Sequence, residues 1–422
     1  MEQKKYLVLL IFITQFTIIG CFNKSKEKII SQNKTEQLIW SQKWFPDNSA
    51  RLKGAIIIDK KGTLIVVGQN FTTTDSIDHP TTIAKISPDG IMLQNKPMGK
   101  TGLYKGKYKK NRPYYDFNED RLVEILKTND QRILLFGYKT FPGFVRKLWM
   151  LEIDNNLNIL KDTVYKNLGV TDTGKMKAFN TSKGWCLASG NYFEEAGLSR
   201  YQIPVYEFNN DFVCTDTKSY VAATVKGGLL SMRTLNSAID YKDNLLLCGT
   251  GALGSRKIDD DDLKSKGCIF QYDRKNKQSR LLLQCEENMY PMYIRPNAGK
   301  YCVLSRFYEK IDKDSTNIYN TMVCYDSKFK ELWRDRQLVG KGMTPNYVTF
   351  YNEQWHAYGT CFRSGFMVFY ELIYDKRGKL LNTKYSANSL EADVVGEISS
   401  SELIFRLFTD NGWRIDKIGF TN

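Results

Sequence analysis

Basic and aromatic side chains alternate between residues 100 and 116, where the sequence reads KTGLYKGKYKKNRPYYD. Cations neutralise anionic groups and aromatic rings stack on flat faces, so this mixture is typical of surfaces that bind acidic glycans, nucleic acid or acidic proteins. A solvated loop without a ligand is the alternative interpretation. The candidate binding residues are Lys105, Lys107, Tyr108, Lys109, Lys110, Arg112, Tyr114 and Tyr115.

Four consecutive aspartates at residues 259–262 form the most concentrated acidic run in the chain. Carboxylate oxygens are the ligands that Ca²⁺ prefers, but the spacing is not that of an EF-hand and four consecutive residues cannot all face one ion. We therefore interpret the run as a solvated acidic loop. The sequence predicts no metal site and no cofactor, and Asp259 and Asp261 are the weak candidates for metal ligands.

Histidine is scarce: the chain has only His79 and His356, and it contains neither an HExxH motif nor a glycine-rich phosphate loop. This composition leaves little room for histidine–metal sites or for a Ser-His-Asp triad. We expect His79 in an exposed loop and His356 packed within a strand. No catalytic residue is predicted, although the fold could bring together a pair of carboxylates that spacing does not reveal.

The first 21 residues have the pattern of a signal that directs a protein out of the cytoplasm. Lys4 and Lys5 precede an apolar run at residues 6–19, which is short for a membrane span and suits a signal peptide. The run ends in Gly20 and Cys21, and this ending resembles the bacterial lipobox, in which the cysteine is lipidated and becomes the new N-terminus. A plain signal peptide or an uncleaved anchor is the alternative. We expect a signal peptide at 1–20, a flexible tether at 21–37 and a membrane anchor on Cys21.

The polar segment after Cys21 indicates on which side of the membrane the protein is expected to lie. Lipoproteins of the Bacteroidota that reach the cell surface often carry an acidic cluster directly after the lipidated cysteine. Here the segment reads Asn23, Lys24, Ser25 and Lys26, which favours the periplasmic face of the cell envelope. In that compartment we expect no nucleic-acid partner.

The rest of the chain repeats a β pattern. The 422 residues carry a formal net charge of +15 and are 42% apolar, which excludes a disordered chain. Seven copies of an apolar strand end near residues 68, 137, 190, 249, 305, 359 and 408, each within a unit of strands and Asp, Asn or Gly turns. We predict an all-β propeller of seven four-stranded blades at 38–422, closed by a strand near 39–44. Six or eight blades, or two stacked β-sandwiches, are the alternatives.

Eight cysteines follow Cys21 in a compartment that permits disulfides. Cys302 and Cys324 fall on neighbouring strands of one repeat, and Cys186 and Cys214 share another. Others, such as Cys248, stand in apolar strands as small core residues do. Connectivity is not readable from sequence, and we expect most of these thiols to be buried and free.

The repeats resemble the degenerate propeller repeats of bacterial, Bacteroidota-like envelope lipoproteins. In such a ring, the loops between second and third strands and between blades share one face, where ligands bind. We therefore expect a non-catalytic binding module, anchored to the membrane, with a protein or an acidic glycan as partner. A toxin-neutralising immunity protein and a carboxylate-dependent polysaccharide-active enzyme are the alternatives.

Overall fold

The computed structural model describes residues 36–43, 50–70, 81–98, 101–105, 115–141, 145–170, 176–189, 191–195, 198–220, 222–225, 228–232, 236–240, 242–253, 266–312, 315–363, 366–386, 391–399, 402–409 and 412–420. The blades form one compact unit, Leu38–Gly419. Every regular element in these ranges is a strand, and among them no helix is long and apolar enough to cross a membrane.

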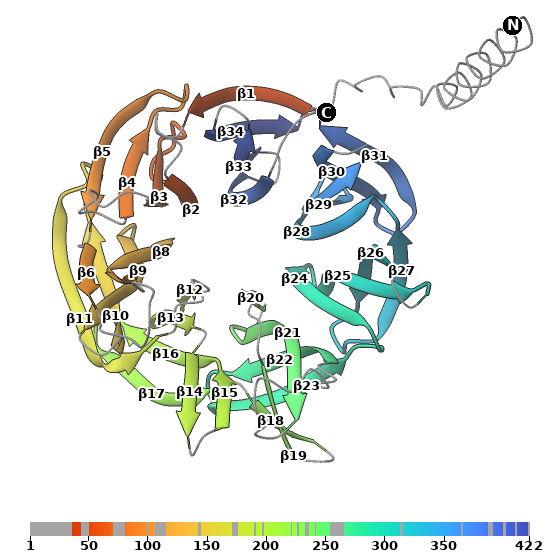
Figure 1. Cartoon of the computed structure of the whole chain (residues 1–422), viewed down its shortest axis with the longest axis horizontal. Helices are drawn as coiled ribbons and strands as arrows, with labels where there is room; N and C mark the ends of the chain where they lie inside the picture. Colours follow the sequence, from red (N-terminus) through yellow and green to blue (C-terminus); the bar gives the residue numbers. More distant parts are fainter. Residues whose placement is uncertain are drawn as a thin grey trace, which may run out of the picture. The chain divides into compact units, whose positions relative to one another are not determined.

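Seven antiparallel sheets stand in a ring, each with its first strand innermost (Figure 1). Blade one comprises β2 (Ala50–Ile57), β3 (Leu64–Asn70), β4 (Thr81–Ile86) and β5 (Met92–Met98). Blade two comprises β8 (Arg121–Lys127), β9 (Ile133–Phe141), β10 (Val145–Ile153) and β11 (Ile159–Gly169). Blade three comprises β12 (Met176–Thr181), β13 (Gly184–Ser189), β16 (Pro204–Asn209) and β17 (Cys214–Tyr220).

The remaining blades repeat this plan. Blade four comprises β20 (Asn236–Ile239), β21 (Leu245–Leu253), β22 (Lys266–Asp273) and β23 (Gln278–Gln284). Blade five comprises β24 (Met289–Asn297), β25 (Lys300–Lys310), β26 (Thr316–Tyr325) and β27 (Glu331–Gln337). Blade six comprises β28 (Lys341–Tyr351), β29 (Gln354–Arg363), β30 (Phe366–Asp375) and β31 (Leu380–Ser386).

Blade seven closes the ring with both ends of the chain. Its strand order is β1-β34-β33-β32, which joins β1 (Glu36–Lys43) to β32 (Glu391–Ser399), β33 (Glu402–Thr409) and β34 (Gly412–Phe420). The predicted seven-bladed propeller and its N-terminal closing strand are confirmed. Closure of this kind joins the two ends of the chain in one sheet, because β1 pairs with β34.

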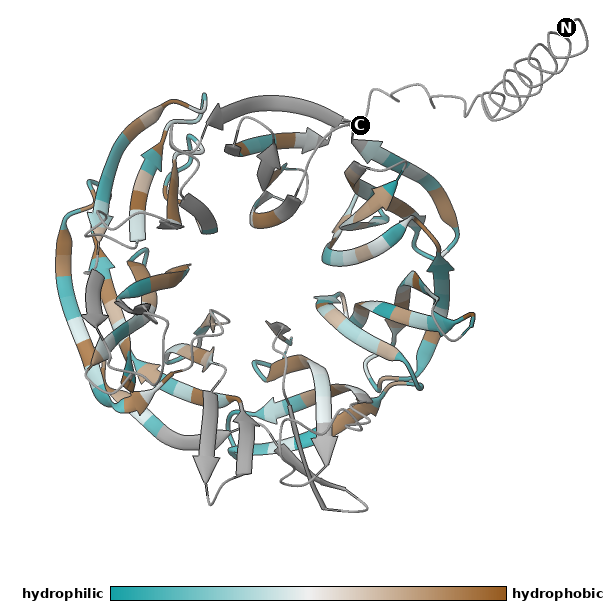
Figure 2. Ribbon diagram, viewed as in Figure 1, coloured by the Kyte–Doolittle hydropathy of each residue, from teal (hydrophilic) through white to brown (hydrophobic). Residues whose placement is uncertain are grey.

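Apolar side chains of the middle strands fill the space between neighbouring blades. Ile65 and Val67 of β3 pack with Leu135 of β9 in one cluster between blades one and two, and all three side chains are fully buried. The outer strands are more polar, as β5 and β11 in Figure 2 show, because they face solvent. Burial of each large aliphatic side chain contributes about 1.5–3 kcal/mol to the stability of the fold, so the packing of neighbouring sheets stabilises every blade.

Two glycines at which the sequence predicted the second strands to end lie inside these strands, against bulges in the first strands. A β-bulge between Leu122 and Glu124 presses the backbone of β8 against Gly137. A Cβ atom on Gly137 would lie 1.7 Å from the carbonyl oxygen of Arg121, so no larger residue fits. Gly359 is confined in the same way by Thr344 and Tyr370. These close approaches explain why the repeat pattern in the sequence ends on glycine.

Within the described ranges, one face of the ring carries eight copies of a five-residue turn. The first side chain accepts a hydrogen bond from the fifth N–H at 2.8–3.0 Å, and the fourth residue has a positive φ between 59° and 91°. The fourth N–H also donates to the first carbonyl. Short polar side chains suit the first position, because they reach back to the main chain. The first residues are Asp59, Ser87, Thr128, Asp154, Asn209, Asp240, Asp326 and Asp375.

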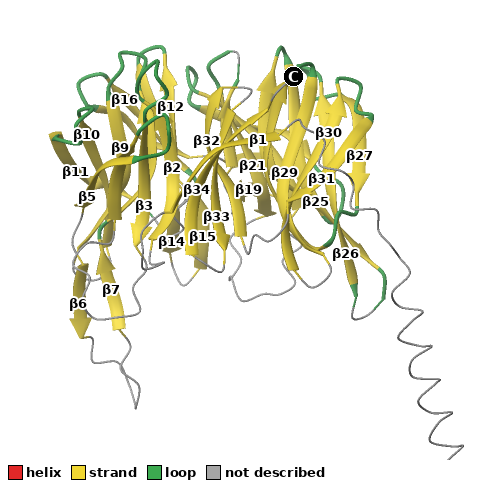
Figure 3. Ribbon diagram, turned by 90° about the horizontal axis from the view of Figure 1, so that it is seen from above, coloured by secondary structure: helices red, strands yellow, loops and turns green. Residues whose placement is uncertain are grey.

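The connections at the opposite ends of the strands contain three added hairpins. They pair β6 (Thr101–Lys105) with β7 (Tyr115–Glu119), β14 (Asn191–Glu195) with β15 (Leu198–Gln202), and β18 (Ala222–Val225) with β19 (Gly228–Met232). Each lies between second and third strands or between blades, and β6 and β7 project from the ring in Figure 3. We call this side the hairpin face and the other the turn face.

Candidate functional site

Polar side chains from the innermost strands of five blades form a central cluster. Each blade contributes a first strand to the inner side of the ring, so residues far apart in sequence meet there (Figure 1). Two residues of β24 share one face of that strand because they are two positions apart. The cluster consists of Glu124 on β8, Lys177 on β12, Tyr293 and Arg295 on β24, Tyr347 and Thr349 on β28, and Glu397 on β32.

Glu397 holds the cluster together. Arg295 donates two hydrogen bonds to its carboxylate, at 2.7 and 2.9 Å, and thereby links blade five to blade seven past the intervening blade six. Tyr347 donates a short hydrogen bond to the same carboxylate, and the Thr349 hydroxyl lies 3.3 Å from its Oε1. A carboxylate offers about four acceptor positions, so Glu397 is fully engaged.

The two tyrosines of the cluster stay protonated. Their ring centroids lie 4.9 Å apart, and Arg295 Nη1 lies 3.5 Å from the Tyr347 hydroxyl. Burial raises the pKa of Tyr347 well above the usual value, and the nearby Tyr293 and Glu397 raise it further. Burial also raises the pKa of Tyr293, against the effect of Arg295. Both phenols are therefore hydrogen-bond donors and not bases near neutral pH.

A second ion pair lies in the same cluster. Lys177 Nζ lies 3.0 Å from Glu124 Oε2, with the lysine half-exposed and the carboxylate largely buried. Burial raises the pKa of Glu124, and Lys177 opposes this shift. The carboxylate in turn raises the pKa of Lys177, with a smaller contribution from Tyr293. In the described part of the cluster each carboxylate thus has its own cation.

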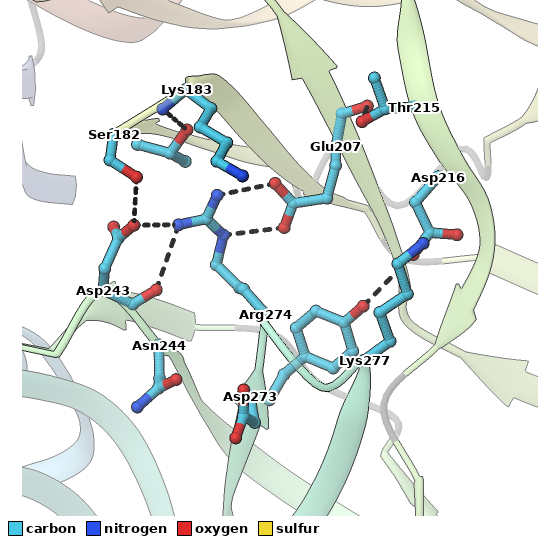
Figure 4. Close-up of polar contacts among 12 residues, drawn as sticks. Ser182, Lys183, Glu207, Thr215, Asp216, Asp243, Asn244, Asp273, Arg274 and Lys277 are labelled. Atoms are coloured by element: carbon cyan, nitrogen blue, oxygen red, sulfur yellow. Dashed lines mark hydrogen bonds and ion pairs between the residues drawn. The ribbon is translucent and has the colours of Figure 1, made fainter.

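A partly buried charged network joins blades three and four (Figure 4). Arg274 donates two hydrogen bonds of 2.8 Å to Glu207 on β16, and it also bonds the carboxylate of Asp243, at 2.5 Å, and its carbonyl oxygen. Burial lowers the pKa of Arg274, but the combined effects of Glu207, Cys186 and Asp243 outweigh it, so the pKa is raised. Because four of its donor contacts are made within the protein, we interpret Arg274 as a clamp between blades.

The predicted binding residues lie mostly outside the described residues. The sequence predicted a loop at 100–116, but the structure forms β6 and β7 at its two ends, with Lys105 opposite Tyr115. The residues of β6 and β7 can pair as two antiparallel strands, but the high charge of the surrounding segment favoured the prediction of a loop. Positions outside the described ranges are Lys107, Tyr108, Lys109, Lys110, Arg112, Tyr114, Asp259, Asp261, His79 and Cys21.

The remaining histidine and the cysteines behave as the sequence predicted. His356 lies in β29 with 5% of its surface exposed, and its Nδ1 lies 2.7 Å from Glu371 Oε1. All eight described cysteines are free, and seven of them are buried. The directly paired Cys302 and Cys324 of blade five therefore pack as small apolar side chains.

Sequence reasoning missed the central cluster, since no motif connects its members. Arg295 and Glu397 are 102 residues apart, and Lys177 and Glu124 are 53 apart. One weak signal was present: Tyr293 and Arg295 stand at alternate positions of a first strand, where apolar residues would be expected on a buried face.

Comparison with known proteins identifies the fold and not a family. No family model matches the chain, and no curated protein matches it. The structure of a polysaccharide lyase, the PL25 ulvan lyase bound to -[GlcA(1-4)Rha3S]-, is similar over 90% of this chain and 96% of that one, with a TM-score of 0.57 and 10% identity. The β-propeller domain of the Trilobed protease from Pyrococcus furiosus matches over 90% of this chain and 97% of that one, with a TM-score of 0.46 and 12% identity. At such identities the likeness is one of fold: this chain is a seven-bladed β-propeller.

Proposed function

We propose that this protein is a lipid-anchored propeller of a bacterial cell envelope that binds an acidic glycan without cleaving it. The observation that carries the proposal is the asymmetry of the two faces. Tight five-residue turns cover one face, whereas three hairpins extend the other. Longer, variable connections on a rigid scaffold are where binding residues are usually found.

The β6–β7 hairpin supports an anionic ligand. Its two strands hold both ends of the basic and aromatic segment in register, with Lys105 paired to Tyr115. A paired stem brings the two ends of the basic and aromatic segment together. Residues 100–116 contain six basic residues, and the whole chain has a net charge of +15. Both would attract a polyanion, over a distance that shortens as the salt concentration rises.

The central cluster supports binding over catalysis. Glu397 is engaged by Arg295, Tyr347 and Thr349, and Glu124 by Lys177. General-base catalysis needs a group that can accept a proton near the working pH. Glu397 is fully engaged and the two phenols stay protonated, so among the described groups of the cluster only Glu124, itself paired with Lys177, could accept a proton.

Affinity electrophoresis through gels that contain polygalacturonate tests the proposal. We expect the wild type to be retarded by polygalacturonate and not by neutral dextran. A variant with Lys107, Lys109, Lys110 and Arg112 changed to glutamate should be retarded much less than the wild type. The matched control changes four exposed cations of the turn face, Lys60, Lys61, Arg377 and Lys379, to glutamate, and it should retain most of it. Equal loss in both variants would indicate a general charge effect and contradict a site on the hairpin face.

The anchor is tested separately. Cys21→Ala should release the protein from membranes into the soluble fraction, because the acyl chains would then be absent. A Cys21→Ala variant that stays with the membrane would contradict lipidation at this position, while leaving the glycan proposal untouched.

A polysaccharide-degrading enzyme is the second candidate, because the central cluster also gathers cations around one carboxylate whose pKa is raised. Tyr347, Arg295 and Lys177 could neutralise a sugar carboxylate, and Glu124 could accept the proton that is abstracted beside it. The likeness in fold to a polysaccharide lyase agrees with this candidate but does not extend to residues. Incubation with polyuronates, followed by ultraviolet absorbance for an unsaturated product, tests it. A lyase would give a rising signal that Tyr347→Phe removes, and a binder would give none.

A further inference from the structure

A groove of about 720 Å³ lies between blades four and five on the turn face. Blade four lines it with Asp240 and Lys242 from the turn after β20, and with Gln271 and Arg280 from β22 and β23. Blade five contributes Tyr301, at the start of β25, and the turn residues Lys328 and Phe329. Cavities of this size hold ligands of a few sugar rings, and neither the hairpin face nor the central cluster contributes to this groove.

The carboxylate oxygens of the two aspartates in the groove already accept hydrogen bonds from within the protein. The Asp240 carboxylate accepts the backbone N–H groups of Lys242 and Asn244, at 2.8 and 2.9 Å, and the side-chain amides of Asn244 and Gln271, at 3.2 and 2.8 Å. Its side chain is buried, with 4% of the residue exposed. The other carboxylate, of Asp273, accepts two hydrogen bonds from Asn276. Because these acceptors are occupied, they compete little for the cations nearby.

The positive charge faces the open space. Arg280 donates its Nε–H to Gln271 Oε1 at 2.8 Å, and Gln271 in turn donates to Asp240, so this relay fixes the plane of the guanidinium. Within the described ranges neither Arg280 nor Lys328 forms an ion pair with a carboxylate. Lys242 and Lys328 hold the same position, the third residue, in turns that begin at Asp240 and Asp326. Three exposed cations thus border the groove.

An apolar wall completes the groove. The ring of Phe329 stacks on Tyr301 with centroids 4.5 Å apart and planes 17° apart. Tyr301 is buried, whereas Phe329 is half-exposed and Leu282 of β23 lies beside it in the lining. Phe329 occupies the fourth turn position with a φ of 61°, a backbone conformation that costs energy for a residue with a side chain. Aromatic rings beside fixed polar groups suit the C–H faces and oxygens of a sugar.

We infer that this groove is a second binding site, for a carboxylate-bearing sugar of an acidic polysaccharide. Arg280 binds the sugar carboxylate, since a guanidinium oriented by one hydrogen bond still presents further donors to an anion. Lys242 and Lys328 add positive charge from the two blades, and Phe329 packs against the ring. The site lies on the turn face, so it goes beyond the ligand surface proposed for the hairpin face.

Isothermal titration of the full-length protein with trigalacturonate tests the inference. Arg280→Gln and Lys328→Gln should each weaken binding, by about tenfold for Arg280, as expected for one charge-assisted hydrogen bond. The matched control is Arg377→Gln, because Arg377 is the third residue of the equivalent turn in blade six, and it should bind as the wild type does. The midpoint of urea unfolding, measured for each variant, checks that all of them fold.

Two further arms identify the ligand chemistry. A neutral galactose trisaccharide should not bind, and a sulfated galactose trisaccharide that binds equally would assign the site to sugar anions in general and contradict a preference for carboxylate. The variant with four glutamates in the β6–β7 hairpin should keep its affinity for trigalacturonate, which separates this groove from the hairpin face. Absence of binding to the wild type, or equal affinity of wild type and Arg280→Gln, would overturn the inference.

Discussion

Arg295 and Glu397 form a two-point ion pair, at 2.7 and 2.9 Å, between strands of blades five and seven that are 102 residues apart in sequence. Blade six lies between them and joins the pair through Tyr347. The pair therefore couples three blades near the point where the ring closes. Its partners are partly buried, with 31% and 20% of their side-chain surfaces exposed, so its loss should be felt in stability.

Removing the cation of this pair should destabilise the protein. Arg295→Met leaves Glu397 without its strongest donor, and we expect the free energy of unfolding to fall by about 1–3 kcal/mol. Urea unfolding measures the change. The exposed pair of Lys376 and Glu353 is the matched control, and Lys376→Met should cost at most about 0.5 kcal/mol. Equal effects of the two substitutions would contradict the role assigned to Arg295.

A side chain at Gly137 should disrupt the contact between β8 and β9. Gly137→Ala places a Cβ atom 1.7 Å from the Arg121 carbonyl oxygen, so the strands must separate. We expect a loss of about 3 kcal/mol or more, or a failure to fold. Gly299→Asn is the control, because Gly299 has a φ of 75° and nothing within 4 Å of an added Cβ; it should cost only about 1 kcal/mol. Comparison of melting temperatures and soluble yield decides between these outcomes.

Stability should fall in acid because of the turn face. Hydrogen bonds donated by Asn158 lower the pKa of Asp154 from the ordinary 3.8. The backbone N–H groups of Lys330 and Lys379 do the same for Asp326 and Asp375, respectively. A lowered pKa means that the folded state favours the charged form, so this stabilisation is present above the unfolded pKa and is lost as pH falls through the folded value.

We therefore expect the free energy of unfolding to be insensitive to these turns above about pH 5 and to decrease below about pH 4. Urea titrations between pH 5 and 2.5 follow the decrease. Asp154→Asn keeps the acceptor oxygen but cannot ionise, so the free energy of unfolding of this variant should depend less steeply on pH below about pH 4. A slope that Asp154→Asn leaves unchanged would contradict a contribution from this turn.

The thiols should be inert in the folded protein. Burial raises the pKa of Cys285 to about 12 and those of Cys214, Cys324 and Cys361 to about 11, which leaves little thiolate at pH 8. We expect the eight cysteines after Cys21 to resist iodoacetamide in the native state and to react in denaturant, as mass spectrometry would show. Rapid labelling of the native protein, or disulfides in the purified protein, would contradict this packing.

The sequence predicts this fold well where the determinants are local. Several second strands are apolar runs that reach a glycine where the neighbouring first strand presses on the backbone, as at Gly137, and the described turns of the turn face begin with a short polar residue, as at Asp154. The closing strand was predicted because the last repeat lacked an outer strand, which β1 supplies.

The candidate sites could not be predicted in the same way. The groove brings Arg280 of blade four near Lys328 of blade five, and the central cluster brings Arg295 of blade five to Glu397 of blade seven. How neighbouring blades are oriented relative to one another is not encoded in any local sequence pattern. The hairpins were missed for a different reason, since β6 and β7 are short and their charge is typical of solvated loops.

If the hairpin face binds an acidic glycan, the dissociation constant for polygalacturonate must depend on the basic residues of that face. It should be measured by titration at low and at physiological ionic strength, for the wild type and for the variant with Lys107, Lys109, Lys110 and Arg112 changed to glutamate. We predict that the wild type binds more tightly at low salt and that the variant loses at least about tenfold in affinity. Equal affinities of the two proteins at both salt concentrations would contradict the account.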